Sequence, residues 1–333
     1  MAAASRSGAP RPDAPELSVV VPSHERPVRL RWLLNALEEQ TLERDRWELV
    51  VVHDSGEDTE RLLREHPLAA AGVLRHVRLA RGTGSAARQR NVGWREARAP
   101  LIAFTDDDCR PEADWLERML EAARTNPGAV IQGRTKPDPY EAEIMDWAPR
   151  PRSIDIDPPT PHAQTCNILY PRAALERVDG FDESIRTAGE DWDLAARAQK
   201  AGAGYVGEPR ATVYHAVDTF SLLGLMRFNS RWQTLALVLK RHPEQRGVLA
   251  HGLFWKRRHA LLVPALAGVA LSRRSPALAL LAVPYVRDAM PYHGGGPLGR
   301  ARAAVELTGR AAVDLSELWA MVRGSARFGT LVL

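Results

Sequence analysis

Short apolar runs rich in β-branched residues alternate with segments of helical pattern along the first part of the chain. The run LSVVVP at residues 17–22 has the length and composition of a strand buried on both faces of a sheet. The predicted strands are residues 17–22, 48–52, 73–79, 101–105 and 129–133. The predicted helices are residues 27–40, 57–66, 85–97, 111–124 and 189–201. This alternation predicts an α/β fold with a doubly wound, mostly parallel sheet flanked by helices.

Acidic residues directly follow two of these predicted strands. Asp54 comes shortly after the strand at 48–52, and a run of aspartates follows the strand at 101–105. In open α/β sheets, ligands bind beyond the carboxyl ends of the strands. We therefore expect these acids to lie at the ligand-binding edge of the sheet. For Asp54, an ordinary Asx turn is the alternative interpretation.

The adjacent residues Asp106, Asp107 and Asp108 are the strongest chemical signal. Three neighbouring carboxylates repel one another, and a bound cation relieves this repulsion. Carboxylate oxygens are hard ligands that suit Mg²⁺ or Mn²⁺. Asp106 and Asp108 are two positions apart, so both can face one metal ion that also contacts phosphate groups. A solvated acidic turn is the alternative interpretation.

A second group of candidate residues lies further along the chain. Glu190 and Asp191 begin a predicted helix, where the helix dipole stabilises negative charge. They either cap the helix, or one of them accepts a proton from an attacking hydroxyl. His215 ends a β-rich run, and a neutral imidazole can complete a metal shell beside carboxylates. A purely structural role is the alternative for this histidine.

The segment that precedes the helix at 85–97 and its first turn could contact a phosphate-bearing ligand. Arg88 and Asn91 lie near the start of this helix, where an arginine can bind diphosphate or pair with Asp54. A solvated helix face is the alternative. The glycine-rich residues 82–85 match neither the Walker loop nor the dinucleotide-binding fingerprint, so an ATPase or dehydrogenase is not expected.

The composition divides the chain into three parts. Residues 1–16 lack an apolar run, which predicts a disordered tail rather than a secretory signal. Residues 17–220 form the predicted α/β domain, and residues 221–333 form a predicted helical, partly apolar extension. This extension holds 16 basic and 5 acidic residues, whereas the first 220 residues hold 29 basic and 36 acidic residues. Such a basic region suits anionic lipid, nucleic acid or a phosphate-bearing substrate, but it lacks the aromatic-basic pattern of a nucleic-acid groove.

Two apolar runs within residues 260–286 are separated by Arg273 and Arg274. Each run is shorter than the ~20 residues that a bilayer-spanning helix needs. Joining them into one span would place two arginines in the bilayer, at roughly 2.5–3.5 kcal/mol each. We therefore expect an interfacial or re-entrant hairpin at the cytoplasmic face of a membrane, with a buried core hairpin as the alternative.

Cys109 and Cys166 have no zinc-site spacing and indicate free thiols in a reducing cytosol.

Six sequence blocks, taken in order, resemble family 2 glycosyltransferases over about residues 17–216. The blocks are SVVVPSHERP (18–27), ELVVVHDSG (48–56), AARQRN (86–91), FTDDDCRP (104–111), CNILYPRAALERVDGFDE (166–183) and GEDWDL (189–194). The resemblance implies a GT-A fold and an inverting transfer of a sugar from a nucleoside-diphosphate sugar to a hydroxyl acceptor. It also implies Mn²⁺ or Mg²⁺ as the cofactor.

The resemblance suggests a role for each candidate residue. The expected donor-binding residues are Pro22, Ser23, Glu25, Asp54, Arg88, Asn91 and Asp107. Asp106 and Asp108 match the metal-holding DxD element, and His215 matches a histidine near the metal in some members. Asp191 matches the catalytic base, with Glu190 orienting the acceptor.

The sequence departs from the family pattern at two motifs, and the second departure disfavours a processive polysaccharide synthase. The familiar Asp-Asp-Gly-Ser is here HDSG at residues 53–56, and the QRRW motif of processive synthases is not clear.

A membrane location would favour a lipid-linked or cell-envelope glycan as acceptor. One alternative is a degenerate transferase that acts as a membrane-recruited binding module. Another is a sugar-phosphate nucleotidyltransferase, which needs a glycine-rich N-terminal loop that PSHERP at 22–27 lacks.

Overall fold

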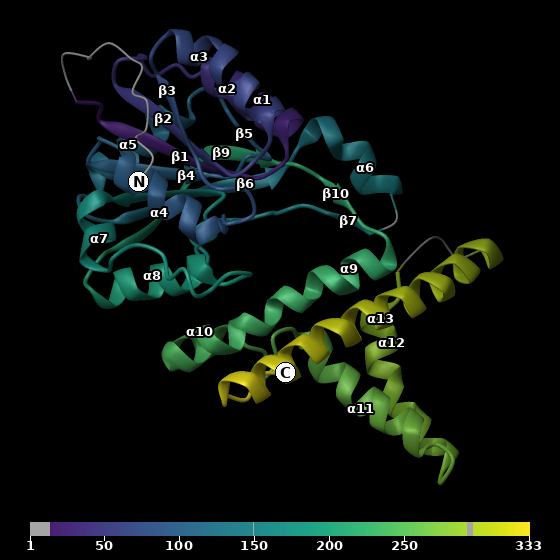
Figure 1. The fold of residues 1–333 in the computed structure, drawn as a ribbon. Helices are drawn as coiled ribbons and strands as arrows, with labels where there is room; N and C mark the ends of the chain where they lie inside the picture. Colours follow the sequence, from purple (N-terminus) through teal and green to yellow (C-terminus); the bar gives the residue numbers. More distant parts are fainter. Residues whose placement is uncertain (1–13, 149, 292–295) are drawn as a thin grey trace. The chain divides into compact units, whose positions relative to one another are not determined.

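The computed structural model describes residues 14–148, 150–291 and 296–333, and the chain divides into two compact units (Figure 1). The first unit comprises the described residues up to Arg186 together with Glu190–Thr219. The second comprises Thr187–Gly189 and Phe220–Leu333. Most of the predicted disordered tail, residues 1–13, lies outside the described residues. Glu16, at its end, donates its backbone N–H to the carbonyl of Arg46 at 2.8 Å.

The described part of the first unit contains an eight-stranded sheet with the strand order β3-β2-β1-β4-β8-β6-β9-β5. The strands are β1 Leu17–Ser23, β2 Trp47–His53, β3 Leu74–Arg78, β4 Leu101–Thr105, β5 Cys109–Pro111, β6 Val130–Pro137, β8 Asn167–Pro171 and β9 Tyr205–His215. The first four strands pair in parallel, and β6 is parallel to β9. Strand β8 is antiparallel to both neighbours, and β5 is antiparallel to β9. The expected mostly parallel, doubly wound sheet is confirmed.

Helices cover both faces of this sheet, as Figure 1 shows. The α-helices in the described part of this unit are α1 Pro27–Glu38, α2 Glu57–Glu65, α3 Pro67–Ala70, α4 Ala86–Glu96, α5 Trp115–Thr125, α6 Ala142–Trp147, α7 Arg172–Arg177 and α8 Glu190–Lys200. Val19 and Val21 of β1 pack in the cluster that contains α1 and α5, whereas Val20 packs in the cluster that contains α4 and α8. Because successive side chains of a strand point to opposite faces, an unbroken apolar run such as β1 serves both layers.

The sequence prediction misses elements whose strand character depends on distant partners. The helix expected from residue 111 begins only at Trp115, because residues 109–111 pair with β9 as strand β5. Strand β6, predicted to end at residue 133, continues to Pro137, and α6 and the short strand β7 Pro151–Arg152 follow where no element was predicted. Strand β7 pairs with β10 Asp218–Thr219 in a separate two-stranded sheet.

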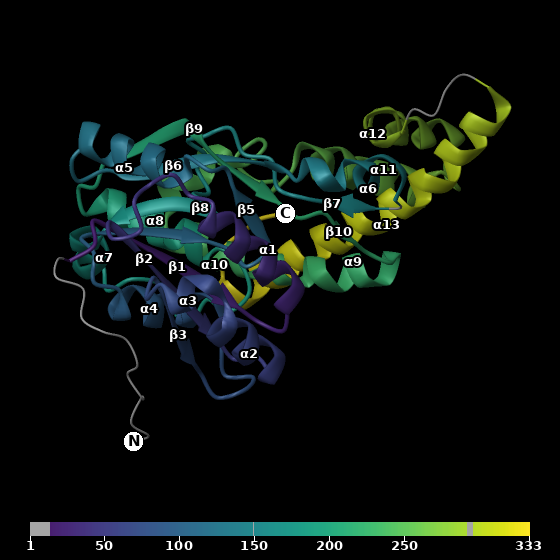
Figure 2. The same ribbon diagram turned by 90° about the horizontal axis from the view of Figure 1, so that it is seen from above.

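The second unit is helical in its described part. Its α-helices are α9 Leu222–Asn229, α10 Leu235–Arg241, α11 Arg257–Leu271, α12 Val283–Ala289 and α13 Pro297–Phe328. Figures 1 and 2 show α13 as the long helix of this unit, with α9 and α10 packed against it. Gly329 ends α13 with a φ of 63°, a left-handed conformation that glycine adopts readily at a helix end. None of the described helices combines the length and apolar character that a bilayer span requires.

Candidate active site

The carboxyl ends of β1, β2 and β4 meet at one edge of the sheet. Strand β1 pairs in parallel with both neighbours, with Ser23 opposite His53 and Val20 opposite Phe104. The chain leaves β2 at Asp54 and β4 at Asp106. The parallel register therefore brings the acids that follow these strands together.

Asp54 is buried, with 1% of its surface exposed, and several donors surround its carboxylate. It accepts hydrogen bonds from the backbone N–H of Gly84 at 3.1 Å and the amide of Gln89 at 3.2 Å. His24 Nδ1 lies 2.7 Å from the same carboxylate. Burial opposes ionisation of Asp54, but the hydrogen bonds from His24 and Gly84 outweigh it and lower its pKa. The result is a fixed, ionised acceptor at the end of β2.

The other residues expected to line a nucleotide pocket lie beside Asp54. Pro22 and Ser23 end β1 and are buried. Glu25 follows with a φ of 51°, and its backbone N–H donates to Ser55 Oγ at 2.7 Å. The exposed Glu25 carboxylate lies 3.0 Å from Arg81. These residues are thus placed together at one edge of the sheet.

Asp107 points into the protein rather than outward. It accepts hydrogen bonds from Ser23 Oγ at 2.8 Å and from the backbone N–H of His24 at 3.3 Å. Burial, with the charge of Asp108 next in size, raises the pKa of Asp107 to about 7. This carboxyl therefore joins β4 to the end of β1, which leaves its two neighbours to face a ligand.

One of the two carboxylate oxygens of Asp108 has no hydrogen-bond partner. Arg26 pairs with its Oδ2 and lies 3.7 Å from Asp107. The other oxygen, Oδ1, is buried without a hydrogen-bond partner and lies 3.6 Å from His215 Nε2. A buried carboxylate oxygen without a partner is costly, and a cation would satisfy it.

Strand β9 supplies the histidine that faces Asp108. His215 pairs in register with Cys109, the residue that follows Asp108. Its Nδ1 lies 2.8 Å from the carbonyl oxygen of Ala216, to which it can donate a hydrogen bond, so Nε2 is the ring nitrogen that is turned toward Asp108. Cys109 lies in the same cluster, but burial raises its thiol pKa well above the usual range, so the sulfur stays neutral. A carboxylate oxygen and an imidazole nitrogen at this spacing fit a divalent cation.

Arg90 joins two of the predicted acidic groups. It donates from Nη2 to Asp106 at 2.7 Å and from Nη1 to Glu190 at 3.0 Å. Its side chain is only 5% exposed. Burial opposes its charge, but the two carboxylates outweigh this effect and raise the pKa of Arg90. A permanently charged guanidinium therefore holds α4, the end of β4 and the start of α8 together.

The two residues that the sequence suggested on this helix have other partners. Arg88 is exposed and donates to the carbonyl oxygen of Thr83 at 3.2 Å. The Asn91 amide donates to the Phe181 carbonyl oxygen and the Glu183 carboxylate, each at 2.9 Å. Asn91 is thus engaged within the protein, where it anchors the segment before α8.

Sequence reasoning missed Gln89 and Arg90, which contact the acids of this edge. A signal for Arg90 was present. Ser85 caps the helix by accepting from the backbone N–H of Arg88, which fixes where α4 begins. With this start known, the helical period places residues 87, 90, 91 and 94 on the inner face, and all four are buried.

Asp191 follows Glu190 in the first turn of α8. Desolvation, with the charge of Glu190 next in size, raises the pKa of Asp191 to about 7. A carboxyl with such a pKa exchanges protons near neutrality, which a general base requires. Asp193, in the same turn, instead pairs with Arg197 at 2.7 Å and is fully buried.

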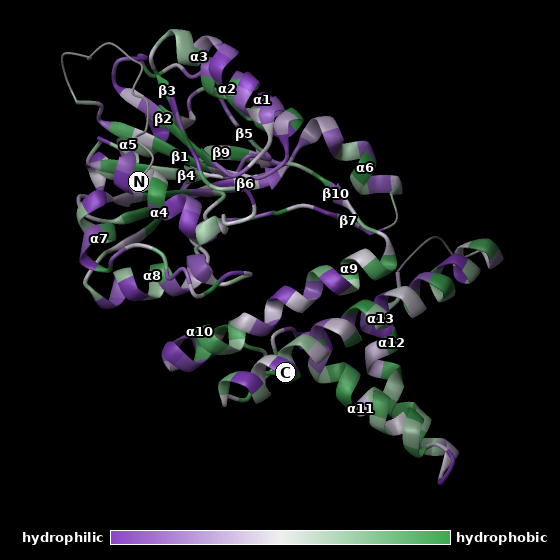
Figure 3. Ribbon diagram, in the orientation of Figure 1, coloured by the Kyte–Doolittle hydropathy of each residue, from purple (hydrophilic) through white to green (hydrophobic). Residues whose placement is uncertain are grey.

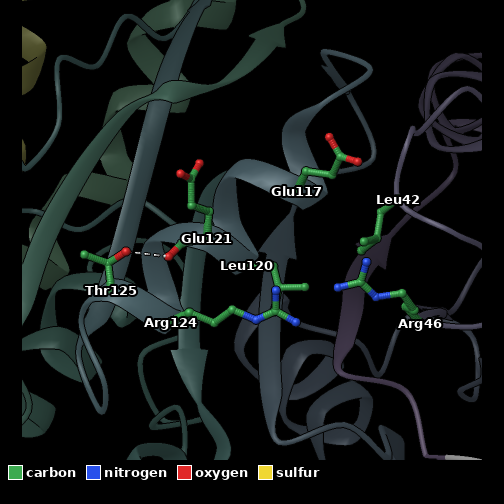
Figure 4. A pocket seen from close by; sticks show the side chains of 7 residues that line it. All are labelled: Leu42, Arg46, Glu117, Leu120, Glu121, Arg124 and Thr125. Atoms are coloured by element: carbon green, nitrogen blue, oxygen red, sulfur yellow. Dashed lines mark hydrogen bonds between the residues drawn. The ribbon is translucent and has the colours of Figure 1, made fainter.

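A separate hollow of about 420 Å³ contains none of these residues (Figure 4). It is lined by Leu42, Arg46, Glu117, Leu120, Glu121, Arg124 and Thr125. Its two arginines both pair with Glu16, which precedes β1 and so lies at the opposite end of the strands. This hollow is therefore not part of the acidic site.

Comparison with known proteins agrees with this geometry. Residues 18–179 match the model of "Glycosyl transferase family 2". Glycosyltransferase AglE of Haloferax volcanii is 30% identical over 194 residues, which cover 56% of this chain and 62% of that protein. Succinoglycan biosynthesis protein ExoM of Rhizobium meliloti is 29% identical over 231 residues, which cover 64% of this chain and 72% of that protein.

A solved structure shows the same fold over most of the chain. The mannosyltransferase PcManGT from Pyrobaculum calidifontis, in complex with GDP-Man and Mn²⁺, superposes with a TM-score of 0.58 at 19% identity. The match covers 96% of this chain and 88% of that one. The matched family model and the curated relatives show that residues 18–179 are a domain of glycosyl transferase family 2.

Proposed function

We propose that this chain transfers a sugar from a nucleoside-diphosphate sugar to a hydroxyl acceptor with inversion at the anomeric carbon. One observation carries the proposal. The open Asp108–His215 pair and the Arg90-linked carboxylates Asp106 and Glu190 belong to one edge of the sheet. The family match supports the reaction class, and PcManGT, a protein of the same fold, was solved with GDP-Man and Mn²⁺.

The donor is proposed to bind along the edge formed by β1 and β2. Asp54 would accept a hydrogen bond from the nucleotide base, because its charge is fixed and its position is held by Gly84. Pro22, Ser23 and Glu25 would line the same pocket, and Arg88, which is exposed, is free to approach a phosphate. Asp107 would act indirectly, by holding the turn after β1.

The proposed metal ligands are Asp106, Asp108 and His215. The buried, unpartnered Asp108 Oδ1 and the His215 Nε2 that lies 3.6 Å from it support this assignment. When bound, Mn²⁺ or Mg²⁺ would neutralise charge on the leaving diphosphate. Arg26, now paired with Asp108, would be released to pair with phosphate oxygens.

The proposed base is Asp191. With a pKa of about 7, its ionised form is available near neutral pH and binds a proton firmly enough to take it from an acceptor hydroxyl. The hydroxyl oxygen then forms the new bond to the anomeric carbon as the bond to the diphosphate breaks. Attack from the face opposite the leaving group inverts that carbon. Glu190 would orient the acceptor while Arg90 holds it in place.

The acceptor is proposed to be a lipid-linked or cell-envelope glycan, with the protein peripheral at the inner face of the cell membrane. The basic, apolar extension supports this part of the proposal. The alternative of a degenerate binding module is disfavoured because the predicted metal-binding and base carboxylates are all present. A nucleotidyltransferase is disfavoured by the family match.

The test measures release of nucleoside diphosphate from UDP-, GDP- and dTDP-sugars, with and without a cell-envelope glycan acceptor. Asp191→Asn should reduce acceptor-dependent release by about 100-fold or more, the scale of general base catalysis. Nucleotide affinity should stay within about threefold, because less than 1 kcal/mol is at stake. Asp179→Asn is the matched control, since Asp179 is 93% exposed and outside the site. Equal loss of transfer and nucleotide binding in Asp191→Asn would reject the assigned role.

A further inference from the structure

Helix α11, the 3-10 segment η4 Pro276–Ala282 and α12 form a helical hairpin that we call the apolar hairpin, residues 257–289. One face of α11 is buried at helical spacing, through His259, Leu262, Ala265 and Gly268. The rest of its surface is apolar but exposed. The large exposed side chains are Val263 at 40%, Leu266 at 43%, Val269 at 59%, Leu271 at 39%, Leu280 at 68%, Leu281 at 44% and Val283 at 46%.

The apolar hairpin is a packed element rather than an unfolded tail. A Cβ on Gly268 would lie 2.3 Å from the carbonyl oxygen of Leu278, so α11 and η4 are in close backbone contact. At its base, Arg258 pairs with Asp288 at 3.1 Å and Tyr285 donates to Asp314 at 2.9 Å. Its exposed apolar side chains therefore project from a defined scaffold.

The charges on this element are almost all positive. Between residues 259 and 286, Arg273 and Arg274 are the only charged residues in the sequence. Both are exposed at the turn between α11 and η4, and Figure 3 shows this purple turn at the end of a mostly green hairpin. Exposed Arg257 adds positive charge at the other end of α11, whereas the neighbouring Lys256 pairs with Glu317 at 2.6 Å. An apolar surface with a basic rim is complementary to an anionic lipid surface.

We propose that the apolar hairpin lies flat in the headgroup region of an anionic bilayer and docks the protein there. Helix α11 has 15 residues and is roughly 22 Å long at 1.5 Å per residue, shorter than the ~30 Å hydrocarbon core. Insertion with the turn foremost would carry Arg273 and Arg274 into hydrocarbon. In the flat orientation, both side chains reach lipid phosphates while Leu266, Val269 and Leu280 enter the acyl boundary.

A second copy of the chain is a poorer occupant of this surface. The hairpin offers no acidic residue between positions 259 and 286 to pair with the arginines of a partner hairpin. Lipid docking is separate from the transfer chemistry proposed above, because it involves none of the residues assigned to the donor or the base. It rests on the membrane location proposed above, but it can fail or succeed independently of the proposed sugar transfer.

The test is co-sedimentation of the full-length chain with vesicles of phosphatidylcholine alone or mixed with phosphatidylglycerol. We expect binding to the anionic vesicles that weakens as salt is added. The double variant Val269→Glu with Leu280→Glu changes only exposed side chains, so it should fold and should lose binding by about tenfold or more. Arg273→Ala with Arg274→Ala should lose on the order of thirtyfold, about fivefold per charge. Val305→Glu, at 72% exposure on α13, is the matched control and should bind normally.

Three outcomes would overturn the proposal. One is that wild type binds neither kind of vesicle. Another is that the double glutamate variant binds as well as wild type. The third is a wild-type dimer in solution that the same glutamates dissociate, without vesicle binding, which would make a second copy the occupant. Release of nucleoside diphosphate, measured with a water-soluble acceptor, should be equal in wild type and the hairpin variants whichever outcome is found.

Discussion

Replacement of Arg90 by methionine should destabilise the first unit strongly, because this one side chain pairs with two carboxylates. Arg90 is 5% exposed, Glu190 is 12% exposed and Asp106 is 27% exposed. Removal of one partner from a buried ion pair costs about 3–5 kcal/mol, since it leaves an uncompensated charge. The partial exposure of Asp106 moves the expected loss toward the lower end, about 3 kcal/mol.

Thermal unfolding followed by circular dichroism measures this loss. For a unit of this size, a change of 1 kcal/mol shifts Tm by roughly 2–4 °C, so the expected decrease is about 6–12 °C. The measurement is made at pH 8 with EDTA, so that no cation bridges the exposed carboxylates.

Two further variants make the result specific. Arg88→Met removes an exposed arginine two positions away and should change stability by less than about 0.5 kcal/mol. Arg90→Lys keeps the charge but loses the planar fork that reaches both acids, so it should fall between wild type and Arg90→Met. If Arg90→Met were no less stable than Arg88→Met, Arg90 would not be the group that holds the site together.

Two other predictions concern the proposed reaction and its donor. Because Asp191 has a pKa of about 7 and must be ionised to act as a base, the rate of transfer should fall as pH decreases through 7; a rate that is constant between pH 6 and 8 would contradict this role. Gly84→Ala would place a Cβ 2.9 Å from Asp54 Oδ2, so nucleotide affinity, measured by calorimetry, should fall by about tenfold, the equivalent of 1.4 kcal/mol. Gly82→Ala is a poor control because Gly82 has a φ of 71°, whereas Gly56→Ala meets no atom within 4 Å and should bind nucleotide normally.

The strands with a strong local pattern could be predicted from the sequence. Strand β4 has the predicted bounds, and β1 and β2 differ by one residue at the ends, because unbroken apolar runs are typical of strands buried on both faces. Strand β5 could not be predicted in this way. It has three residues, one of them proline, and it is a strand only because β9, about 100 positions later, pairs with it.

The acidic half of the site was also readable, because Asp54 and Asp108 directly follow predicted strands. The basic half was missed, although the sequence carried a signal for Arg90. Whether Arg88 or Arg90 faces the acids depends on the phase of α4, and that phase is set by the Ser85 cap. The pairing of Arg26 with Asp108 joins residues 82 positions apart, and no local pattern indicates it.

The extension shows a different limit of sequence reasoning. The two apolar runs form α11 and the η4–α12 segment, as their composition suggests. The sequence could not show that α11 buries only the face of Leu262 and Ala265 and exposes residues such as Val269. The apolar composition of α11 fits both a buried core and an exposed interface. The buried face is identified by packing, for example of Gly268 against Leu278.

Protection of the protein by nucleotides tests the central claim most directly. Thermal unfolding is followed with UDP, GDP or dTDP and their sugars, each with Mn²⁺ and with EDTA. At a ligand concentration of about 100 times Kd, the bound nucleotide adds roughly 2.7 kcal/mol of stability. We predict that one base stabilises the protein, that the effect requires Mn²⁺, and that Asp108→Ala abolishes it while its Tm without ligand stays near that of wild type. A folded protein that no nucleotide stabilises, with or without Mn²⁺, would contradict the proposed donor site.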